Sequence, residues 1–263
     1  MARNDQVVPI AEGDFIQSLG KGLAVIRAFS AERKSMTLSE VAAVTGISKP
    51  SARRIVLTLQ SLGYMSNTDG AFRLLPKVLD LGYAYISSFE LPEIAQPHLD
   101  ALNEQLGEVC SLGVLDGSDV IYLGRSQSKR VMSTTIRIGS RIDPVATAVG
   151  RVLLADLPED ELTSFLEKHS FEAYTEHTVT EPGQVRARLA HIRERGWELA
   201  DQEKELGVRT IAAPITDISG ETVAAVNIAT NYMRVPMDRL LDEFLTALLD
   251  TAARIRKDLA DYR

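Results

Sequence analysis

The sequence predicts an α+β chain, in which a winged helix-turn-helix near the amino end precedes an antiparallel sheet covered by helices. Two observations support this. Between residues 15 and 75, apolar residues recur with helical spacing and lead into one short hairpin pattern. Beyond residue 108, short apolar runs flank turn-forming residues at both ends of the region, with helical segments between them, as in an α+β sheet.

The composition limits the class of protein. The chain has 263 residues, 45% of them hydrophobic, enough for one large domain or two smaller ones. No run of 18 apolar residues occurs and the amino end lacks a secretory apolar segment, so we expect no membrane partner. Cys110 is the only cysteine, which favours the cytoplasm and, for Cys110 itself, a buried apolar position.

The net charge of −7 is unevenly distributed. Residues 1–75 contain nine Lys and Arg against six Asp and Glu, a balance of +3, so the remainder has 20 against 30, a balance of −10. A basic amino part can approach phosphates while an acidic remainder keeps the chain in solution.

The amino part begins with a polar stretch, residues 1–14, which we predict to be a disordered tail. Apolar residues at steps of three and four then indicate a first helix. Thr37 and Glu40 have the spacing of a capping box, which predicts the start of a second helix. Gly46 is placed to end it, because glycine is favoured just beyond a helix.

A third helix is predicted to start at Ser48, which is placed to cap it, with Pro50 in its first turn. Its apolar residues form one stripe and leave cationic and hydroxyl side chains on the free face. The sequence Thr68-Asp69-Gly70, between two short apolar runs, predicts a β-hairpin. This order of elements is that of a winged helix-turn-helix over residues 15–75.

A helix with an exposed cationic face is suited to the major groove of DNA. Its first N–H groups favour phosphate, and its arginines can either read guanine or bind the backbone. The alternative is a helical hairpin with a solvated face, but the capping box, turn and hairpin together favour DNA binding. The residues that we expect to contact DNA are Thr37, Ser48, Lys49, Ser51, Arg53, Arg54, Thr58 and Arg73.

The rest of the chain alternates helical and strand patterns. Residues 76–91 are predicted to form a linker helix with an apolar stripe of Leu79, Tyr83 and Ile86, which either packs against another copy or simply begins the next domain. A helix is expected at 92–107. Strands are predicted at 109–115, 120–126, 132–138, from 197, at 209–215 and at 222–229, with helices near 147–155, 158–169, 182–196 and 237–259.

Catalytic and metal-binding patterns are missing from the sequence. The four histidines form no pair with metal-ligand spacing, Cys110 has no local histidine, and no phosphate-binding loop or nucleophile elbow occurs. We therefore predict no enzyme activity, no cofactor and no metal site. The competing hypothesis from another class is an enzyme or sensor that does not bind DNA.

Four stretches together resemble the IclR family of bacterial transcription regulators: SLGKGLAVIRAF, TLSEVAAVTGISKPSARRIVLTLQSLGY, GSRIDPVATAVGRVLLA and GVRTIAAPITDISGETVAAVNI. The stretches DFIQSLGKGLAVIRAF and VMSTTIRIGSR are most similar to regulators of protocatechuate, 4-hydroxybenzoate and β-ketoadipate breakdown. The resemblance implies a DNA-binding domain, a linker helix and a GAF-like effector domain over residues 92–263. It also implies dimers or tetramers of the chain on palindromic double-stranded operator DNA.

The predicted ligand site begins where a helix starts near Thr147 and Ala148. Free N–H groups there would attract a carboxylate, although packing around Gly150 explains the same pattern. The resemblance favours the ligand. Asn227 lies within an apolar run, where an amide needs partners or costs about 1–3 kcal/mol; it either satisfies backbone groups or holds a ligand.

The resemblance adds Asp201 and Thr210, which border the pocket in the family but would otherwise indicate a solvated turn. Thr134 is predicted to point inward and Arg137 outward, because residues three apart lie on opposite faces of a strand. The expected ligand is a small organic acid of aromatic-acid catabolism, with a sugar acid or short-chain acid as the alternative. The predicted effector-binding residues are Thr134, Thr147, Ala148, Asp201, Thr210 and Asn227.

Overall fold

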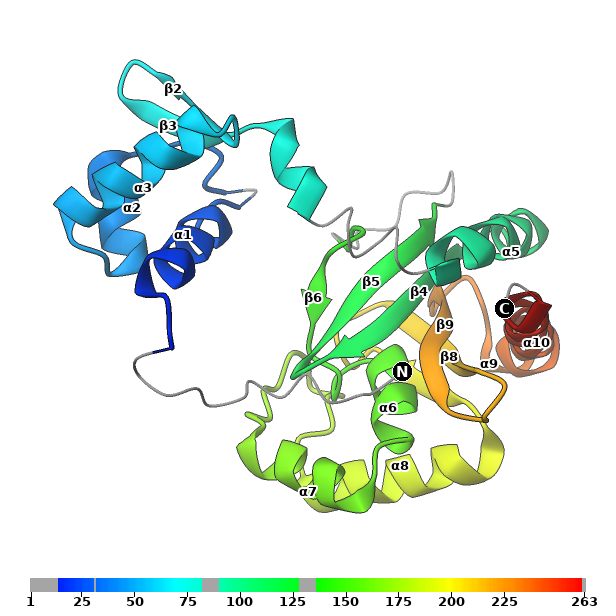
Figure 1. Ribbon diagram of the computed structural model, residues 1–263. Helices are drawn as coiled ribbons and strands as arrows, with labels where there is room; N and C mark the ends of the chain where they lie inside the picture. The colour runs from blue at the N-terminus through cyan, green and yellow to red at the C-terminus, as the bar shows by residue number, and fades with distance from the viewer. Residues whose placement is uncertain (1–13, 31, 82–89, 128–135, 262–263) are drawn as a thin grey trace. The chain divides into compact units, whose positions relative to one another are not determined.

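The computed structural model describes residues 14–30, 32–81, 90–127 and 136–261 (Figure 1). The chain forms two compact units, a smaller one within Gln6–Ser88 and a larger one that contains Phe89–Arg263.

The smaller unit is a winged helix-turn-helix, as predicted. Helices α1 (Gln17–Arg27), α2 (Leu38–Thr45) and α3 (Lys49–Ser61) pack around one apolar core, and β2 (Met65–Thr68) and β3 (Ala71–Leu74) form the expected hairpin. The two residues of β1 (Met36–Thr37) pair with the other edge of β3, giving the sheet order β1-β3-β2. This third strand was not predicted, because two residues carry no periodicity.

Local capping explains where the second and third helices begin. The Thr37 N–H donates to Glu40 Oε2 over 2.7 Å, and the Glu40 N–H donates to Thr37 Oγ1 over 3.4 Å, so the predicted capping box is confirmed. Gly46 ends α2 at φ 67°, a conformation that favours glycine. Ser48 occupies the predicted N-cap position of α3, but its side chain makes no capping hydrogen bond.

The predicted linker helix lies largely outside the described residues, and so do Tyr83 and Ile86. Its described part begins with a 3-10 turn, η1 (Pro76–Val78), and continues as helix over residues 79–81. Leu79, the one described member of the predicted stripe, is 74% exposed. The linker and its boundaries at residues 76 and 91 therefore stay predictions.

The larger unit contains a six-stranded sheet in the order β6-β5-β4-β9-β8-β7, in which all neighbouring pairs are antiparallel. The predicted α+β class is confirmed. The strands are β4 (Val109–Asp116), β5 (Asp119–Ser126), β6 (Arg141–Ile142), β7 (Glu198–Asp201), β8 (Val208–Thr216) and β9 (Thr222–Asn231).

The strand predicted at residues 132–138 is wrong in its described part. Residues 136–138 form no strand, because the chain turns there: the Ser140 N–H donates to the Arg137 carbonyl over 2.9 Å, and Gly139 has φ 83°. The strand beside β5 is instead the two-residue β6, which starts just after this turn.

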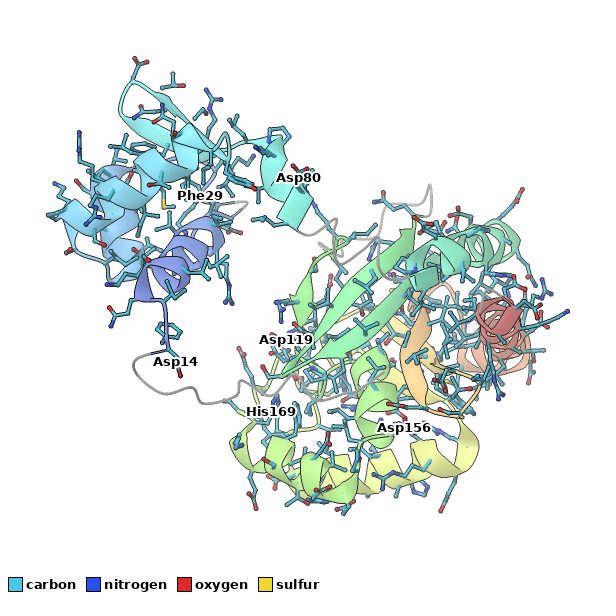
Figure 2. The ribbon with its side chains drawn as sticks, viewed as in Figure 1. Asp14, Phe29, Asp80, Asp119, Asp156 and His169 are labelled. Carbon is cyan, nitrogen blue, oxygen red and sulfur yellow. The ribbon has the colours of Figure 1, made fainter. Side chains whose placement is uncertain are left out.

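Helices cover both faces of the sheet (Figure 1). On one face α5 (Glu90–Leu106) and α10 (Leu245–Asp261) enclose a core, and on the other α6 (Ala148–Ala155), α7 (Glu159–Lys168) and α8 (Pro182–Arg195) enclose a second. The predicted closing helix is divided into α9 (Met237–Arg239), a π-helical turn, η2 (Leu240–Phe244), and α10. Side chains fill the space between these layers (Figure 2).

Strand alternation assigns residues to the two cores. On β9, Val226 and Ile228 face α5 and α10, whereas Ala225 faces α6. Cys110 is fully buried on the α5 face of β4, as predicted, and burial raises the pKa of its thiol. No helix within the described ranges is long and apolar enough to span a bilayer.

Candidate nucleic-acid interface and ligand cavity

Helix α3 buries one stripe and exposes the other face. Ala52, Val56 and Leu59 pack into the core of the smaller unit. The opposite face carries Lys49, Arg53 and Arg54, whose exposed side chains form no hydrogen bond or ion pair with any described residue. Three cations are therefore available to a partner on one helix face, and the N-terminus of that helix is also positive.

The remaining predicted DNA contacts lie on α3, at the N-caps of α2 and α3, and on the wing. Ser48 and Thr58 are exposed and Ser51 is half-buried. The Thr58 hydroxyl donates to the Arg54 carbonyl over 2.8 Å, and Arg73 on the wing donates to Thr68 Oγ1 over 3.1 Å. The hydroxyl of Thr37 belongs to the capping box. Contact of these residues with DNA stays a prediction.

In the larger unit, a partly enclosed cavity of about 50 Å³ lies between the start of α6 and the face of the sheet that α6 covers. Four of the six predicted effector-binding residues, Thr147, Ala148, Thr210 and Asn227, line it. Thr134 lies outside the described residues. The polar residues that line the cavity from the sheet are Ser111, Tyr122, Arg125, Thr210 and Asn227.

Strand register brings three of these polar residues together. Ser111 on β4 pairs directly with Arg125 on β5 and with Asn227 on β9. Directly paired residues share a face of the sheet, so Arg125, Ser111 and Asn227 form one row across three strands. The row combines a cation, a hydroxyl and an amide on the face of the sheet that lines the cavity.

Asn227 places a buried hydrogen-bond acceptor at the cavity. Its side chain is 4% exposed, and its Oδ1 has no hydrogen-bond partner among the described residues. A buried acceptor without a donor costs about 1–3 kcal/mol, so such a group is expected where a ligand or water supplies the donor. Within the described part of the chain, Oδ1 thus satisfies no backbone group, and the ligand role of Asn227 stays a prediction.

The start of α6 forms the opposite wall. Thr147 is the N-cap, and the Gly150 N–H donates to its Oγ1 over 3.1 Å, so one of the predicted free N–H groups is used by the helix itself. Ala148 and Val149 line the cavity at the positive end of the helix. Gly150 packs against Pro144, which confirms the packing explanation for that glycine without removing the helix end from the cavity.

Asp201 does not line the cavity, contrary to expectation. Its neighbour Ala200 does, and alternation along β7 turns Asp201 to the other face. There Arg209 donates from Nη2 to Asp201 Oδ2 over 2.8 Å and from Nη1 to the Val235 carbonyl over 3.2 Å. Arg137, expected to point outward, is exposed, although it lies in a turn rather than a strand.

Burial shifts the pKa values of two residues that line the cavity. It raises the pKa of Tyr122 to about 12, although the charge of Arg125 opposes the shift, so the phenol is neutral. Burial also lowers the pKa of Arg125, with Tyr122 opposing. A cation, a neutral phenol and a helix N-terminus are suited to a carboxylate and a hydroxyl on one small molecule.

Sequence reasoning missed a buried ion cluster behind this cavity. Arg151 on α6 has no exposed surface, and its guanidinium binds the carboxylates of Glu198 and Glu203. Burial works against its charge, but the hydrogen bonds and charges of these two carboxylates outweigh it and raise the pKa of Arg151. The available signal was an arginine inside the apolar run AVGRVLLA.

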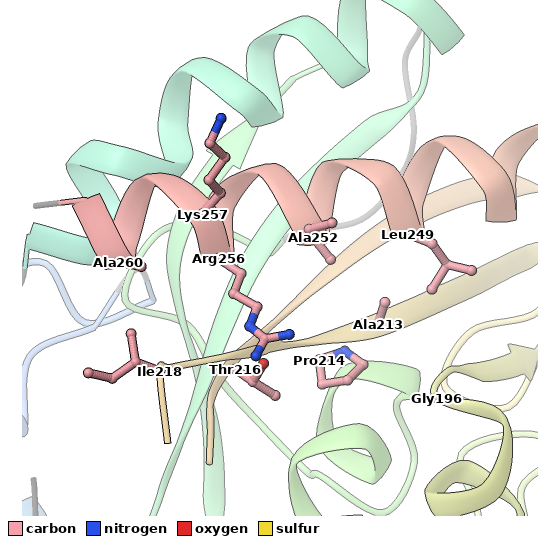
Figure 3. A pocket seen from close by; sticks show the side chains of 11 residues that line it. Gly196, Ala213, Pro214, Thr216, Ile218, Leu249, Ala252, Arg256, Lys257 and Ala260 are labelled. Atoms are coloured by element: carbon pink, nitrogen blue, oxygen red, sulfur yellow. The ribbon is translucent and has the colours of Figure 1, made fainter. Parts of the chain in front are cut away.

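A second hollow is an open groove of about 610 Å³ between α10 and β8. Its lining is mainly apolar; in Figure 3, Arg256 extends toward Thr216 and Pro214, while Lys257 points the other way. No side chain that lines the groove has a buried polar atom lacking a partner within the described part of the chain. The cavity beneath α6 is thus the better candidate for a small ligand.

No group of three or more metal-ligating side chains is found among the described residues.

Two family models match the chain. The IclR helix-turn-helix domain matches residues 18–68, and the bacterial transcriptional regulator IclR C-terminal domain matches residues 83–257. The chain is 39% identical over 237 residues to the Pca regulon regulatory protein of Pseudomonas putida, covering 90% of this chain and 81% of that protein. It is 34% identical over 248 residues to the p-hydroxybenzoate hydroxylase transcriptional activator of Acinetobacter baylyi, covering 92% of each.

Solved structures agree with these matches. The inducer-binding domain of a PobR double mutant from Acinetobacter, in complex with 3-hydroxybenzoic acid, is 32% identical with a TM-score of 0.60, covering 63% of this chain and 97% of that one. An IclR homologue from Microbacterium hydrocarbonoxydans, in complex with 4-hydroxybenzoate, shares the fold at 24% identity with a TM-score of 0.82, covering 92% of this chain and 98% of that one. The two family models account for both units, and the predicted family is confirmed: the chain belongs to the IclR family of bacterial transcriptional regulators and is not an enzyme.

Proposed function

We propose that this regulator binds operator DNA through α3 and the β2–β3 wing, and binds an aromatic carboxylic acid in the cavity beneath α6. It acts in the cytoplasm, on genes of aromatic-acid breakdown. The observation that carries the ligand proposal is the buried Oδ1 of Asn227, which has no hydrogen-bond partner among the described residues. Asn227 lines the same cavity as Arg125.

The cavity supports an acid that also carries a hydroxyl group. Arg125 and the α6 N-terminus favour a carboxylate. The Asn227 amide oxygen is a hydrogen-bond acceptor without a donor among the described residues, so it favours a hydroxyl group on the ligand. The relatives support the aromatic class: the p-hydroxybenzoate hydroxylase activator is 34% identical to this chain, and the related inducer-binding domain was solved with 3-hydroxybenzoic acid.

An exposed apolar stripe supports the proposal that the regulator self-associates. Helix α1 and the residue before it expose an apolar stripe at helical spacing, in which Ile16, Leu19 and Leu23 are 64%, 60% and 48% exposed. A second copy packed on this stripe would place two α3 helices on one DNA, as the half-sites of a palindromic operator require. We therefore propose that the regulator forms a dimer or a larger oligomer.

Substitution of the α3 arginines tests the DNA interface. Arg53→Ala and Arg54→Ala should each weaken binding to DNA from upstream of the regulator's own gene, by about 1–3 kcal/mol where a base contact is lost. Arg254→Ala, on an exposed position of α10, is the control for loss of one positive charge. Affinity should also fall steeply with salt, because bound counterions are released. Equal DNA affinities for all three variants would show that α3 is not the DNA-binding helix.

Isothermal calorimetry tests the ligand class. 4-Hydroxybenzoate, protocatechuate and β-ketoadipate are titrated into the full chain, with gluconate and acetate representing sugar acids and short-chain acids. We expect a binding heat with an aromatic acid, and weaker binding of the same acid to Asn227→Leu. Heat with gluconate or acetate alone would replace the aromatic assignment by the alternative effector class.

A further inference from the structure

A charged cluster is buried directly behind the ligand cavity. Arg151 and Glu198 have no exposed surface, and Glu203 is 3% exposed. Arg188 and Arg195 reach the same carboxylates from positions that are 41% and 37% exposed. Of the three arginines in this cluster, Arg151 is the one that is fully buried, and it does not itself line the cavity.

Arg151 is attached to one cavity wall through the loop before α6. Its Nε donates to the Val145 carbonyl over 2.7 Å. The Val145 N–H in turn donates to Asp143 Oδ1 over 2.8 Å, and the loop continues directly into the N-cap Thr147. The guanidinium thus fixes the loop that sets where the positive end of α6 lies.

The same side chain is attached to the other wall through the acidic turn, residues 201–207. Arg151 Nη1 donates to Glu203 Oε1 over 2.8 Å, and Nη2 binds Glu203 Oε2. Glu203 lines the cavity, as do its neighbours Lys204 and Glu205. One guanidinium therefore contacts both walls, because its planar fork presents donors in several directions.

The acidic turn depends on being held. Gln202 has φ 59°, a left-handed conformation that is unfavourable for a residue other than glycine and persists only where neighbours impose it. The Thr178 hydroxyl donates to the Glu203 carbonyl over 2.6 Å, and the Thr175 hydroxyl donates to the Gln202 carbonyl over 2.7 Å. These bonds hold the backbone of the turn, while Arg151 holds the Glu203 carboxylate.

We infer that Arg151 is a positioning residue that fixes both walls of the cavity, the α6 N-terminus and the acidic turn, and so determines effector affinity without touching the effector. The importance of the cavity for an effector rests on the proposed function. Without Arg151, the Glu203 carboxylate keeps only the half-exposed Arg188, 3.3 Å away, as its cationic partner among the described residues. A buried carboxylate with so little compensation draws the turn toward water.

Hydrogen exchange of the full chain, without ligand, tests the positioning role. In Arg151→Met we expect exchange about tenfold faster in residues 143–150 and 201–208, with α5 and β9 unchanged. Arg254→Met is the matched control, since it also removes one helical arginine. Unchanged exchange in either wall would overturn the inference, and so would equal acceleration throughout the larger unit, which would indicate a general structural role.

Milder variants keep the test decisive if Arg151→Met does not fold. Arg151→Lys retains the positive charge but not the planar fork of donors. Compared with Arg151→Met, it should slow amide exchange in the acidic turn but leave exchange fast in the loop 143–147. Glu203→Gln should loosen the acidic turn alone. If both variants exchange like the wild type, the inference fails.

Calorimetry with 4-hydroxybenzoate separates this inference from the proposed function. If the wild type binds, Arg151→Met should raise the Kd about tenfold, as expected for a misplaced binding wall, and an unchanged Kd would overturn the inference. If the wild type gives no heat with any acid tested, the proposed ligand class fails, while the exchange experiment still decides the positioning role.

Discussion

Pro144 lies so close to Gly150 that a Cβ on Gly150 would come within 2.1 Å of the Pro144 Cα and 2.2 Å of its carbonyl oxygen. Both clashes are with backbone, which cannot rotate away. The glycine therefore sets the distance between α6 and the loop that precedes it, and hence the position of the helix N-terminus at the cavity.

Gly150→Ala should destabilise the larger unit although alanine is the better helix former. Overpacking costs about 1–3 kcal/mol, which exceeds the gain of about 0.5–1 kcal/mol from replacing a helical glycine. Gly183→Ala in α8 is the control, because a Cβ there meets nothing within 4 Å. Denaturant unfolding followed by Trp197, the only tryptophan, measures both. Equal denaturant midpoints for the two variants would show that a side chain on Gly150 does not clash with Pro144.

Asn227→Leu should stabilise the protein and weaken effector binding together. Removal of a buried acceptor that lacks a donor gains about 1 kcal/mol, whereas the ligand loses its partner. Thr230→Val is the control, because Thr230 lies on the opposite face of β9 and its hydroxyl already donates to the Arg209 carbonyl over 3.3 Å. If Asn227→Leu lowers stability, Asn227 has a structural partner and the ligand argument fails.

Thr37→Ala and Ser48→Ala should affect the smaller unit differently. Loss of the Thr37 cap costs about 1 kcal/mol, and exchange of α2 amides should accelerate about fivefold. Ser48 makes no capping bond through its side chain, so Ser48→Ala should change exchange much less. If Ser48→Ala still weakens DNA binding, the Ser48 hydroxyl contacts DNA. If Ser48→Ala accelerates exchange of the α3 amides as much as Thr37→Ala accelerates exchange of the α2 amides, Ser48 caps α3 in solution.

Cys110 should be unreactive in the folded protein. Burial raises the pKa of its thiol, with the charges of Glu108 and Asp100 adding to the shift, so little reactive thiolate exists near neutral pH. A thiol reagent such as dithionitrobenzoate at pH 8 should label no cysteine in the native chain and one after unfolding in urea, because Cys110 is the only cysteine. Rapid labelling of the native protein would place Cys110 at the surface.

The sequence was most informative where a local pattern determines structure. The Thr37–Glu40 capping box, Gly46 and the turn at Asp69–Gly70 each act within a few residues, and all were found where expected. Strand periodicity likewise placed Asn227 within β9. Of the strand expected at residues 132–138, the described part, 136–138, is not a strand. The turn at Arg137–Ser140 depends on a side-chain bond, from the Arg137 N–H to Ser140 Oγ, that periodicity does not show.

The site was harder to predict because its parts are distant in sequence. Asp201 and Thr210 lie in and beside one turn, but only the strand register shows that they face opposite sides of the sheet. Arg151 meets Glu198 and Glu203 across 47 and 52 residues, a separation that no spacing rule covers. The family resemblance located the region of the cavity, and the fold identified which side chains reach it.

The most direct test of the account is a fluorescence anisotropy titration of the full chain onto labelled DNA from upstream of its own gene, repeated with 4-hydroxybenzoate and with protocatechuate. An acid that binds one arrangement of the chain better must shift the titration midpoint, and we expect a shift of about fivefold or more. The same shift should be absent in Asn227→Leu. A midpoint that neither acid moves, or that moves equally in Asn227→Leu, would contradict the account.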